Sequence, residues 1–394
     1  MKKIKILSSS YLLPNHKFWK SLKKNYEVDF CDFGDFSSLS KCREDETLFL
    51  VLFFEDFNFS ESKAKKNIEQ ILLDIKNKFL NFKSKLIISF SYSQDFSPYI
   101  SLNKETKKDK IYYKMKSKIR NLTDHLENIF FLDIEKTFSN FGYKNCLDFR
   151  NWYLFRSRLS NFGLNLLITE INLCLDILNS VSKKVLILDC DNTLWGGVLG
   201  EDGVEGIELG TDGIGLAFYD FQKKILDLEK RGIIICLCSK NNHDDVIQVI
   251  KSHPFMLLRE KHLTELSINW NSKYINIIEL SKKMNLGLDS FVFWDDNPIE
   301  REEVKNNLPE VSVIDVPENV EEWSEILSSS KMFINLNPTT EDKNKTKQYK
   351  VRKKFMNDLE KEENNKLFIK NIKGKPLVVT VDDFSLKRAS QMTI

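Results

Sequence analysis

Four uninterrupted apolar runs between residues 181 and 335 place the strongest constraint on how this chain can fold. They read "KVLILD", "IIICLCS", "SFVFWDD" and "VSVIDV", and polar stretches long enough to form helices separate them. A strand that is apolar on both faces must be covered on both faces, which is typical of a parallel sheet between two layers of helices. The pattern therefore predicts an α/β domain over residues 181–335.

The first part of the chain shows the same alternation. The apolar runs "IKIL", "LFLVLFF", "KLIISF" and "NIFFLDI" alternate with polar helical stretches, which favours a second α/β layer with a largely parallel sheet over residues 1–180. A charged run opens residues 336–394 and predicts a solvated helix, followed by the short strand candidate "PLVVTV". A length of 394 residues is compatible with this division into two or three domains.

The charge balance argues against a nucleic-acid partner. Lys+Arg number 59 and Asp+Glu number 57, so the net charge is only +2, whereas nucleic-acid binding needs a strong local excess of base. The richest basic run, from Lys107 to Arg120, is interpreted as a solvated helix face. A docking surface for an acidic partner is the alternative.

Cysteine usage and hydropathy indicate the cellular compartment. The chain has 7 cysteines and no CxxC pair, which disfavours a disulfide framework or a structural zinc site and favours reduced cytosolic thiols. No stretch approaches about 18 consecutive apolar residues, so neither secretion nor membrane insertion is indicated. We expect a cytoplasmic protein with no membrane partner.

Polar side chains suited to phosphoryl chemistry stand where the apolar runs of residues 181–335 end. In an open α/β sheet, ligands bind beyond the carboxyl ends of the strands. Carboxylates can bind a hard cation such as Mg²⁺ or act as nucleophiles, and hydroxyl and ammonium groups donate to phosphate oxygens. Acids at one strand end are often only caps, but several such groups in chain order predict one phosphate site. The candidates are Asp189, Asp191, Thr193, Ser239, Lys240, Asn241, Lys273, Asp295 and Asp296.

The order of "DCDNT", "CSKNN", Lys273 and "WDDN" resembles the haloacid dehalogenase (HAD) superfamily of aspartate-nucleophile phosphotransferases. The longer string "LDCDNTLWGGVLGEDGVEGIELG", with "INWNSK" and "VFWDDNPIERE", closely resembles the FkbH-like branch of that superfamily over about residues 120–394. The resemblance implies a HAD-type Rossmann-like parallel sheet, preceded by an SGNH-hydrolase-like domain of flavodoxin type.

The resemblance also implies roles for the two acids of the first motif. Asp189 would be the nucleophile, or the carboxylate that grips the phosphate, and a Mg²⁺ ligand. Asp191 would be the general acid/base and would offer its backbone carbonyl to the metal.

Roles for the later motifs follow in the same way. Ser239 would hold a phosphate oxygen through its hydroxyl and backbone N–H. Lys273 would neutralise the phosphate and Asp189, with Lys261 as a possible substitute. Asp296 would ligate Mg²⁺, and Asp295 would be a second ligand or an orienting group. Thr193, Lys240 and Asn241 complete the predicted substrate-binding set.

The spacing of the motifs leaves little room for a cap domain. Only 45 residues separate Thr193 from Ser239, and 33 separate Ser239 from Lys273. We therefore expect a capless domain with an open mouth. Such a mouth suits a substrate arm delivered by a protein, such as phosphopantetheine on a carrier, although small open-site phosphatases also exist.

A cysteine between the two acids raises the question of acyl transfer. FkbH-like enzymes are understood to take the glyceryl group of 1,3-bisphosphoglycerate, release phosphate, and pass the acyl group through an enzyme thioester to an acyl carrier protein. Cys190 is the candidate thiol and Cys238 the second choice, because a thiolate is needed near the gripped phosphate. Packing behind the strand is the alternative, and strand alternation favours it for both residues.

The flanking regions carry weaker signals. "ILSSS" places Ser8, Ser9 and Ser10 where a hydrolase nucleophile would stand, but "CLDFRNWYLFRSR" lacks the late histidine and His125 comes too early, so docking or scaffolding is favoured. Longer relatives continue into an acyltransferase-like region, whereas this chain ends at Ile394.

Three functions are therefore compared. The first is Mg²⁺-dependent transfer of a glyceryl unit from an acyl phosphate to an acyl carrier protein. The second is hydrolysis of a small phosphorylated metabolite through an aspartyl-phosphate. A non-catalytic assembly module ranks last, because every expected motif position is filled.

Overall fold

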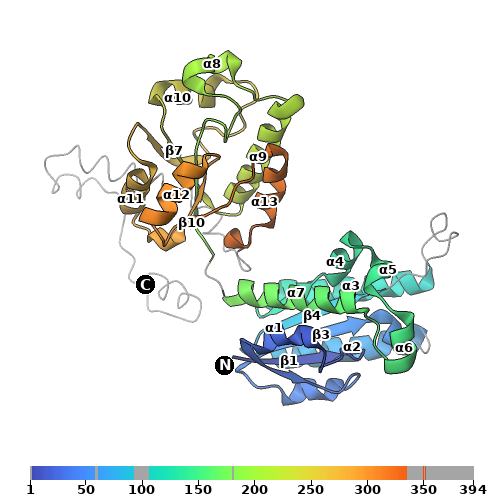
Figure 1. The fold of residues 1–394 in the computed structure, drawn as a ribbon. Coiled ribbons are helices and arrows are strands. Elements are labelled where there is room, and N and C mark those ends of the chain that lie inside the picture. The colour runs from blue at the N-terminus through green and yellow to red at the C-terminus, as the bar shows by residue number, and fades with distance from the viewer. Residues whose placement is uncertain are drawn as a thin grey trace, which may run out of the picture. The chain divides into compact units, whose positions relative to one another are not determined.

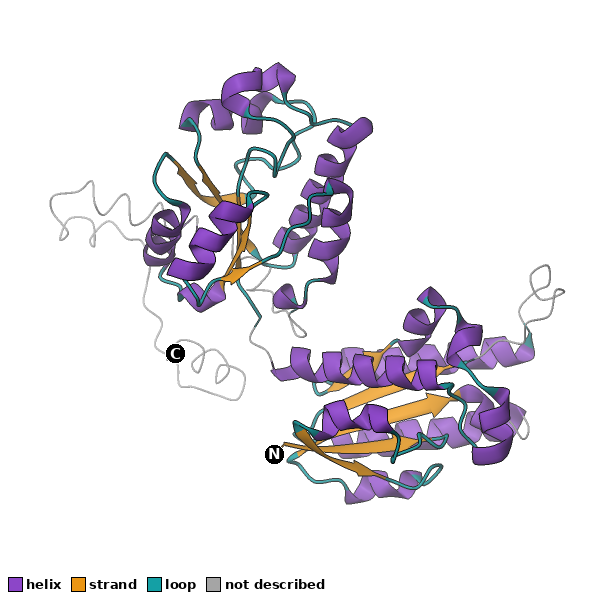
Figure 2. Cartoon of the chain, viewed as in Figure 1, coloured by secondary structure: helices purple, strands orange, loops and turns teal. Residues whose placement is uncertain are grey.

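The computed structural model describes residues 2–57, 61–92, 106–179 and 182–334, together with residues 349 and 351. The chain divides into two compact units, Met1–Val181 and Ser182–Ile394, which are called the N-terminal and C-terminal units below. In each unit a sheet lies between helices (Figures 1 and 2). The predicted helix and strand candidate of residues 336–394 lie outside the described residues.

The N-terminal unit is built on a five-stranded parallel sheet in the order β2-β1-β3-β4-β5. This is the order of flavodoxin-like folds. The strands are β1 (Lys2–Ser8), β2 (Tyr26–Phe30), β3 (Glu46–Phe53), β4 (Leu86–Ser91) and β5 (Ile129–Leu132). The four apolar runs predicted as strands are β1, β3, β4 and β5. The edge strand β2 was missed, because its half-exposed sequence YEVDF contains two acids.

Helices cover both faces of this sheet. On one face, α2 (Glu61–Phe79) and α3 (Lys107–His125) pack against β3 and β4. α3 contains the basic run, and its inward side chains include Tyr112, Met115 and Ile119. On the other face lie α1 (Lys20–Lys23), α4 (Ile134–Asn140), α5 (Tyr143–Cys146) and α7 (Asn161–Asn179). α6 (Phe149–Phe155) buries none of its own residues.

Among the described residues, α7 is the one helix long and apolar enough to cross a membrane by length and composition. Leu164, Leu167, Ile168 and Ile171 of this helix are buried against the sheet. That arrangement is the one expected of a core helix in an α/β layer.

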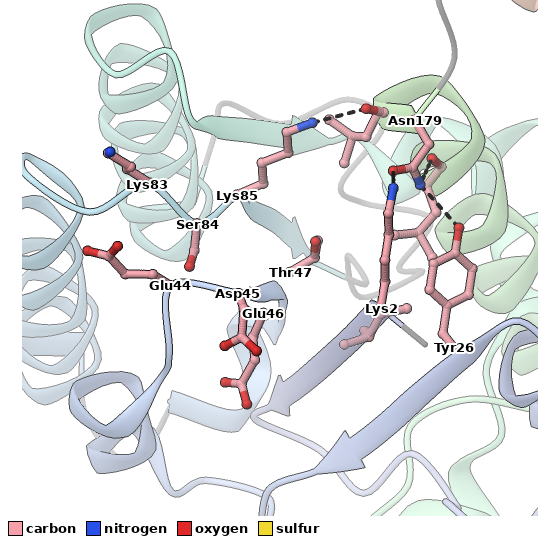
Figure 3. A pocket seen from close by; sticks show the side chains of 13 residues that line it. Lys2, Tyr26, Glu44, Asp45, Glu46, Thr47, Lys83, Ser84, Lys85 and Asn179 are labelled. Carbon is pink, nitrogen blue, oxygen red and sulfur yellow. Dashed lines mark hydrogen bonds between the residues drawn. The ribbon is translucent and has the colours of Figure 1, made fainter.

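The end of α7 is held by lysines from the sheet. A cavity of about 220 Å³ lies near the amino ends of the strands (Figure 3). There the Lys85 ammonium donates to the carbonyl of Leu178 at 3.0 Å, and Lys2 donates to the Asn179 side chain. The last turn of α7 has no basic residue of its own. Because the carboxyl end of a helix carries partial negative charge, these two lysines stabilise it.

The C-terminal unit also has a five-stranded parallel sheet, in the order β10-β9-β6-β7-β8. The strands are β6 (Val185–Leu188), β7 (Ile234–Ser239), β8 (Leu263–Ile268), β9 (Phe291–Trp294) and β10 (Ser312–Val313). The four predicted strands correspond to β6, β7, β9 and β10. β8 was missed, because LTELSI carries Thr264 and Glu265 within a short run.

Successive residues of β6 pack into different cores. Leu186 and Leu188 face α9 (Gly213–Lys230), α10 (His243–Ser252) and α13 (Trp323–Ser329). Val185 and Ile187 face α11 (Lys273–Met284) and α12 (Pro298–Asn307). Figure 1 shows α9 and α13 on one side of this sheet and α11 and α12 on the other. Burial on both faces explains why β6 is uninterruptedly apolar. α8 (Leu199–Gly206) is the short helix that follows β6.

Candidate active site

The candidate site lies at the carboxyl ends of β6 and β9, where the strand order reverses. Leu188 of β6 pairs with Trp294 of β9, and the backbone N–H of Asp189 donates to the Trp294 carbonyl at 3.1 Å. This register places Asp189 beside Asp295, each directly after its strand. Ligands of open α/β sheets bind at such switch points.

Three carboxylates converge there. One side-chain oxygen from each of Asp189, Asp295 and Asp296 lies within 4.8 Å of the others, and Asp189 and Asp295 are only 7% and 0% exposed. The first residue of α11, Lys273, brings its ammonium to 3.1 Å from Asp189 and 2.6 Å from Asp295. With all three acids ionised, one ammonium leaves the cluster with an excess of negative charge.

Burial and repulsion from Asp189 shift the titration of Asp295 and Asp296. Burial, aided by the negative charge of Asp189, raises the pKa of Asp295 to about 7 although Lys273 opposes this. The same two causes raise the pKa of Asp296. Burial disfavours the charged form of Lys273, but the adjacent Asp189 and Asp295 outweigh it and raise the pKa of this ammonium. The lysine therefore stays protonated at neutral pH.

The hydrogen bonds show which oxygens are left for a cation. Both oxygens of Asp295 are used, because Oδ1 accepts from the Asn297 backbone at 2.9 Å and Oδ2 accepts from Lys273. Oδ1 of Asp189 is buried and has no hydrogen-bond partner. A buried, unpaired carboxylate oxygen is costly unless a cation or a substrate reaches it. The oxygen-only set of donors fits Mg²⁺, with Asp189 and Asp296 as the ligands and Asp295 as the partner of Lys273.

We expect the metal-free protein to lose stability as pH rises across the titration of Asp295. Its unfolded pKa is near 3.8 and its folded pKa about 7, so the folded state binds the extra proton between these values. The free energy of unfolding contributed by this group falls over that range and is level above it. Denaturant titrations in EDTA measure the free energy of unfolding. The difference in this free energy between wild type and Asp295→Asn should therefore change from about pH 4 to about pH 7. A difference that is independent of pH would contradict this assignment.

Two predicted substrate-binding residues, Thr193 and Asn241, hydrogen bond to acids of the first and last motifs. The Thr193 hydroxyl donates to Asp296 Oδ1 at 3.2 Å and accepts from the Asp296 backbone at 3.3 Å. The Asn241 amide donates to Asp191 Oδ2 at 2.9 Å. Both side chains are buried, and both hold a carboxylate in place.

Ser239 and Lys240, also predicted to bind substrate, lie at the carboxyl end of β7. Ser239, the last residue of β7, is 2% exposed, and its side chain acts to lower the pKa of the Cys190 thiol against the larger effect of burial. The ammonium of Lys240 lies 2.6 Å from Glu300 Oε1 in the first turn of α12. In this conformation Lys240 is thus an ion-pair partner of Glu300.

Asp191 is held by three donors outside the carboxylate cluster. Its Oδ1 accepts from the indole of Trp195 at 3.0 Å and from the Leu199 backbone at 3.1 Å, and its Oδ2 accepts from Asn241. Burial raises the pKa of Asp191 despite these hydrogen bonds. The carboxyl is therefore fixed in position and is more easily protonated than an exposed aspartate.

The "WGG" segment forms the tight turn that directs these donors. Gly197 has a φ of +92°, and a Cβ there would lie 2.6 Å from Asp202 Oδ2. Its backbone N–H donates to the Asn192 side chain at 2.9 Å, and Asn192 itself has a φ of +51°. A side chain at residue 197 would both strain the backbone and collide with Asp202.

The two candidate thiols are buried in different cores. Cys190 and Cys238 are both 0% exposed. Cys190 packs with the leucines on the α9 side of the sheet, and burial raises its pKa well above that of a free thiol. Cys238 packs on the α11 side, where burial raises its pKa to about 12. These surroundings favour the packing interpretation of both residues.

The alternative lysine, Lys261, lies at the amino ends of the strands, opposite to the candidate site. It precedes β8 and is exposed, so it stands at the amino edge, whereas the acids follow the carboxyl ends. Lys273 is the lysine that reaches the carboxylates.

Several supporting residues were missed by the sequence analysis. Asn269 and Asn276 exchange two side-chain hydrogen bonds at 3.1 and 3.0 Å, which ties the loop after β8 to α11. The Arg301 guanidinium donates to the backbone carbonyls of Asp295 and Asp296, both at 2.7 Å. Arg301 belongs to the "WDDNPIERE" string, but no spacing rule identifies a side chain that bonds to backbone carbonyls.

The serines at the carboxyl end of β1 are used in structural contacts, and the hydroxyl of Ser8, the last residue of β1, accepts from the Ser10 backbone at 3.1 Å. Ser9 donates to Asp56 at 2.7 Å, and Asp56 is also paired with Arg158 at 2.7 Å. Ser10 donates to the backbone carbonyl of Arg156 at 2.8 Å. His125 lies on α3 and contacts the Asn121 carbonyl. None of these contacts forms a serine–histidine pair.

Comparison with known proteins identifies a shared fold. A Bacteroides fragilis structure, described as the N-terminal part of the protein BF1531 containing a phosphatase domain complexed with Mg, matches with a TM-score of 0.71 at 24% identity, over 85% of this chain and 94% of that one. A Bacillus subtilis structure, YxiM, matches with a TM-score of only 0.28 at 14% identity, over 43% of this chain and 54% of that one. No family model and no curated protein matches the sequence. The predicted α/β fold with two parallel sheets is confirmed.

Proposed function

We propose that the C-terminal unit is a Mg²⁺-dependent HAD-type phosphatase that acts on a small phosphorylated substrate through an aspartyl-phosphate at Asp189. The observation that carries this proposal is the buried, unpartnered Oδ1 of Asp189 beside Lys273 and Asp296. This buried carboxylate can bind a cation through one oxygen and attack an electrophile through the other.

Asp189 and Asp296 would hold the metal ion. Bound Mg²⁺ neutralises negative charge on the carboxylates and on the phosphate oxygens. The Mg in the Bacteroides fragilis structure supports the choice of ion. The excess negative charge of the cluster supports it independently.

The chemistry then follows from the positions of two acids. A carboxylate oxygen of Asp189 attacks phosphorus, and the bond from phosphorus to the leaving oxygen breaks. Asp191 supplies the proton to that oxygen. It then takes a proton from the water that cleaves the aspartyl-phosphate and releases orthophosphate. Oδ2 of Asp191 accepts one hydrogen bond and Oδ1 accepts two, so Oδ2 is the oxygen that exchanges the proton.

Lys273 acts on the same groups without transferring a proton. Its ammonium bridges Asp189 and Asp295, and its raised pKa keeps the charge in place at neutral pH. A fixed positive charge at this position stabilises the anionic phosphoryl group during transfer.

Glyceryl transfer from 1,3-bisphosphoglycerate to an acyl carrier protein is a second proposal. It rests on the resemblance of the "TLWGG" and "GEDG" segments to FkbH-like sequences. The reaction needs a thiolate next to the phosphate site, and burial of both Cys190 and Cys238 disfavours one in this conformation. The proposal therefore requires either a rearrangement around Cys190 or direct transfer to the thiol of the carrier.

One experiment separates the two reactions. The full chain is incubated with acetyl phosphate or 1,3-bisphosphoglycerate, with Mg²⁺ or with EDTA, while orthophosphate and protein mass are followed. Mg²⁺-dependent phosphate release without an acyl adduct supports the phosphatase. A hydroxylamine-sensitive glyceryl adduct that Cys190→Ser abolishes supports transfer. Phosphate release that EDTA does not reduce would overturn the metal assignment.

We propose a docking or scaffolding role for the N-terminal unit, in a cytoplasmic protein. The support is the engagement of Ser9 and Ser10 by Asp56 and a backbone carbonyl, which leaves no activated hydroxyl among them.

A further inference from the structure

Exposed apolar side chains stand on the chain segments that carry the charged site of the C-terminal unit. Trp270 is 76% exposed, Ile299 is 75% exposed and Ile275 is 39% exposed. Trp270 stands three positions before Lys273, Ile275 stands two after it, and Ile299 stands three after Asp296. The three residues therefore lie on the loops and first helical turns that hold the site.

Trp270 contrasts with the other tryptophans of this unit. Trp195, Trp294 and Trp323 are each 2% exposed or less and pack in the core. Burial of an indole, which is a large apolar group, lowers the free energy of the protein. An indole that stays in solvent contributes no such stabilisation until a ligand covers it.

The backbone that carries Trp270 is held firmly. The backbone N–H of Asn269 donates to the Ser239 carbonyl at 3.1 Å, and its side chain is locked to Asn276, which is 0% exposed. The Asn271 backbone N–H donates to the Asn269 side chain at 2.9 Å. The contacts of Asn269 thus fix the loop that carries both residues. Lys273 points toward the carboxylates, and Trp270, the residue after Asn269, is exposed. A contact group on a rigid support loses little entropy when a ligand binds.

We propose that Trp270 is a specificity-determining residue that contacts the organic group of the substrate, so that the preferred substrates carry an apolar or aromatic group close to the phosphate. This inference rests on the proposed phosphatase function and names the substrate class. The interior of the site holds carboxylates and an ammonium, which bind the metal and the phosphate but offer no apolar contact. Apolar contacts with a substrate must therefore come from exposed residues such as Trp270.

The test measures binding of two non-hydrolysable phosphonates to the full chain with Mg²⁺ by calorimetry. Phenylphosphonate and methylphosphonate share the anionic group and differ in the organic group. For wild type we expect phenylphosphonate to bind about five- to tenfold more tightly, which is the scale of one aromatic contact. Trp270→Ala should abolish the difference while leaving methylphosphonate binding unchanged, and Trp270→Phe should retain part of it.

Phe255→Ala is the matched control. Phe255 is an exposed aromatic residue of the same unit, but it lies on the segment that enters the amino end of β8. Equal affinities for the two phosphonates in wild type, or a preference that survives in Trp270→Ala, would overturn the inference. Selective phosphonate binding without any phosphate release from phenyl phosphate would instead overturn the proposed function and leave the contact standing. If neither phosphonate binds, the inference about Trp270 and the proposed phosphatase function are both overturned.

Discussion

Replacement of Asp189 by asparagine should reduce Mg²⁺-dependent phosphate release roughly ten-thousandfold or more. The amide cannot attack phosphorus as a carboxylate does, and it is a poorer ligand for the metal. Steady-state phosphate release from p-nitrophenyl phosphate measures the loss. The effect should appear in kcat, because the group acts on the reacting atoms.

The same substitution should leave the metal-free protein folded, and its thermal stability should be equal to or above that of wild type. The three carboxylates of Asp189, Asp295 and Asp296 lie close together and one ammonium contacts two of them, so removal of one negative charge relieves repulsion. Asp244→Asn is the control, because that side chain is 96% exposed on α10. A variant with full activity would refute the nucleophile, and an unfolded variant would refute the proposed repulsion.

Replacement of Lys273 by methionine should lower the free energy of unfolding of the metal-free protein by about 3–5 kcal/mol, which is the usual cost of leaving a buried charge without its partner. The Lys273 side chain is 4% exposed and contacts Asp189 and Asp295, of which Asp295 is fully buried. Phosphate release should be lost as well. Denaturant unfolding in EDTA gives the stability.

A double variant separates loss of the charge pair from loss of packing. If unpaired Asp295 causes the destabilisation, Lys273→Met combined with Asp295→Asn should recover a large part of the lost stability. Lys282→Met, an exposed lysine in the last turn of the same helix, is the control and should stay within about 0.5 kcal/mol of wild type. A double variant as unstable as the single one would show that the aliphatic stem of Lys273 matters more than its charge.

The fold was largely predictable because its central strands are buried on both faces. β3, β4, β6, β7 and β9 are fully or almost fully buried and appear as apolar runs. The strands β2 and β8 were not predicted. Each lies at an edge of its sheet, where one side has no neighbouring strand and polar residues are tolerated.

The site was predictable to the extent that strand ends identify it. Asp189 and Asp295 each follow a strand directly, so parallel pairing was enough to bring them together. The partners of Thr193, Lys240 and Asn241 were not predictable, because a hydroxyl, an ammonium or an amide beside a phosphate site has the same sequence signature whether it binds substrate or an acid. Contacts such as Lys240 with Glu300 depend on how α12 packs, which no local pattern encodes.

The pairing of β6 with β9 has a consequence for how the chain folds. Thr193 and Asp296 are 103 positions apart, so the two halves of the site meet only after a long loop has closed. Closure brings mutually repelling acids together, which should make docking of β9 onto β6 a slow, late event. A divalent ion present during refolding should hasten that event, and the ion would then act as an assembly factor before it takes any part in turnover.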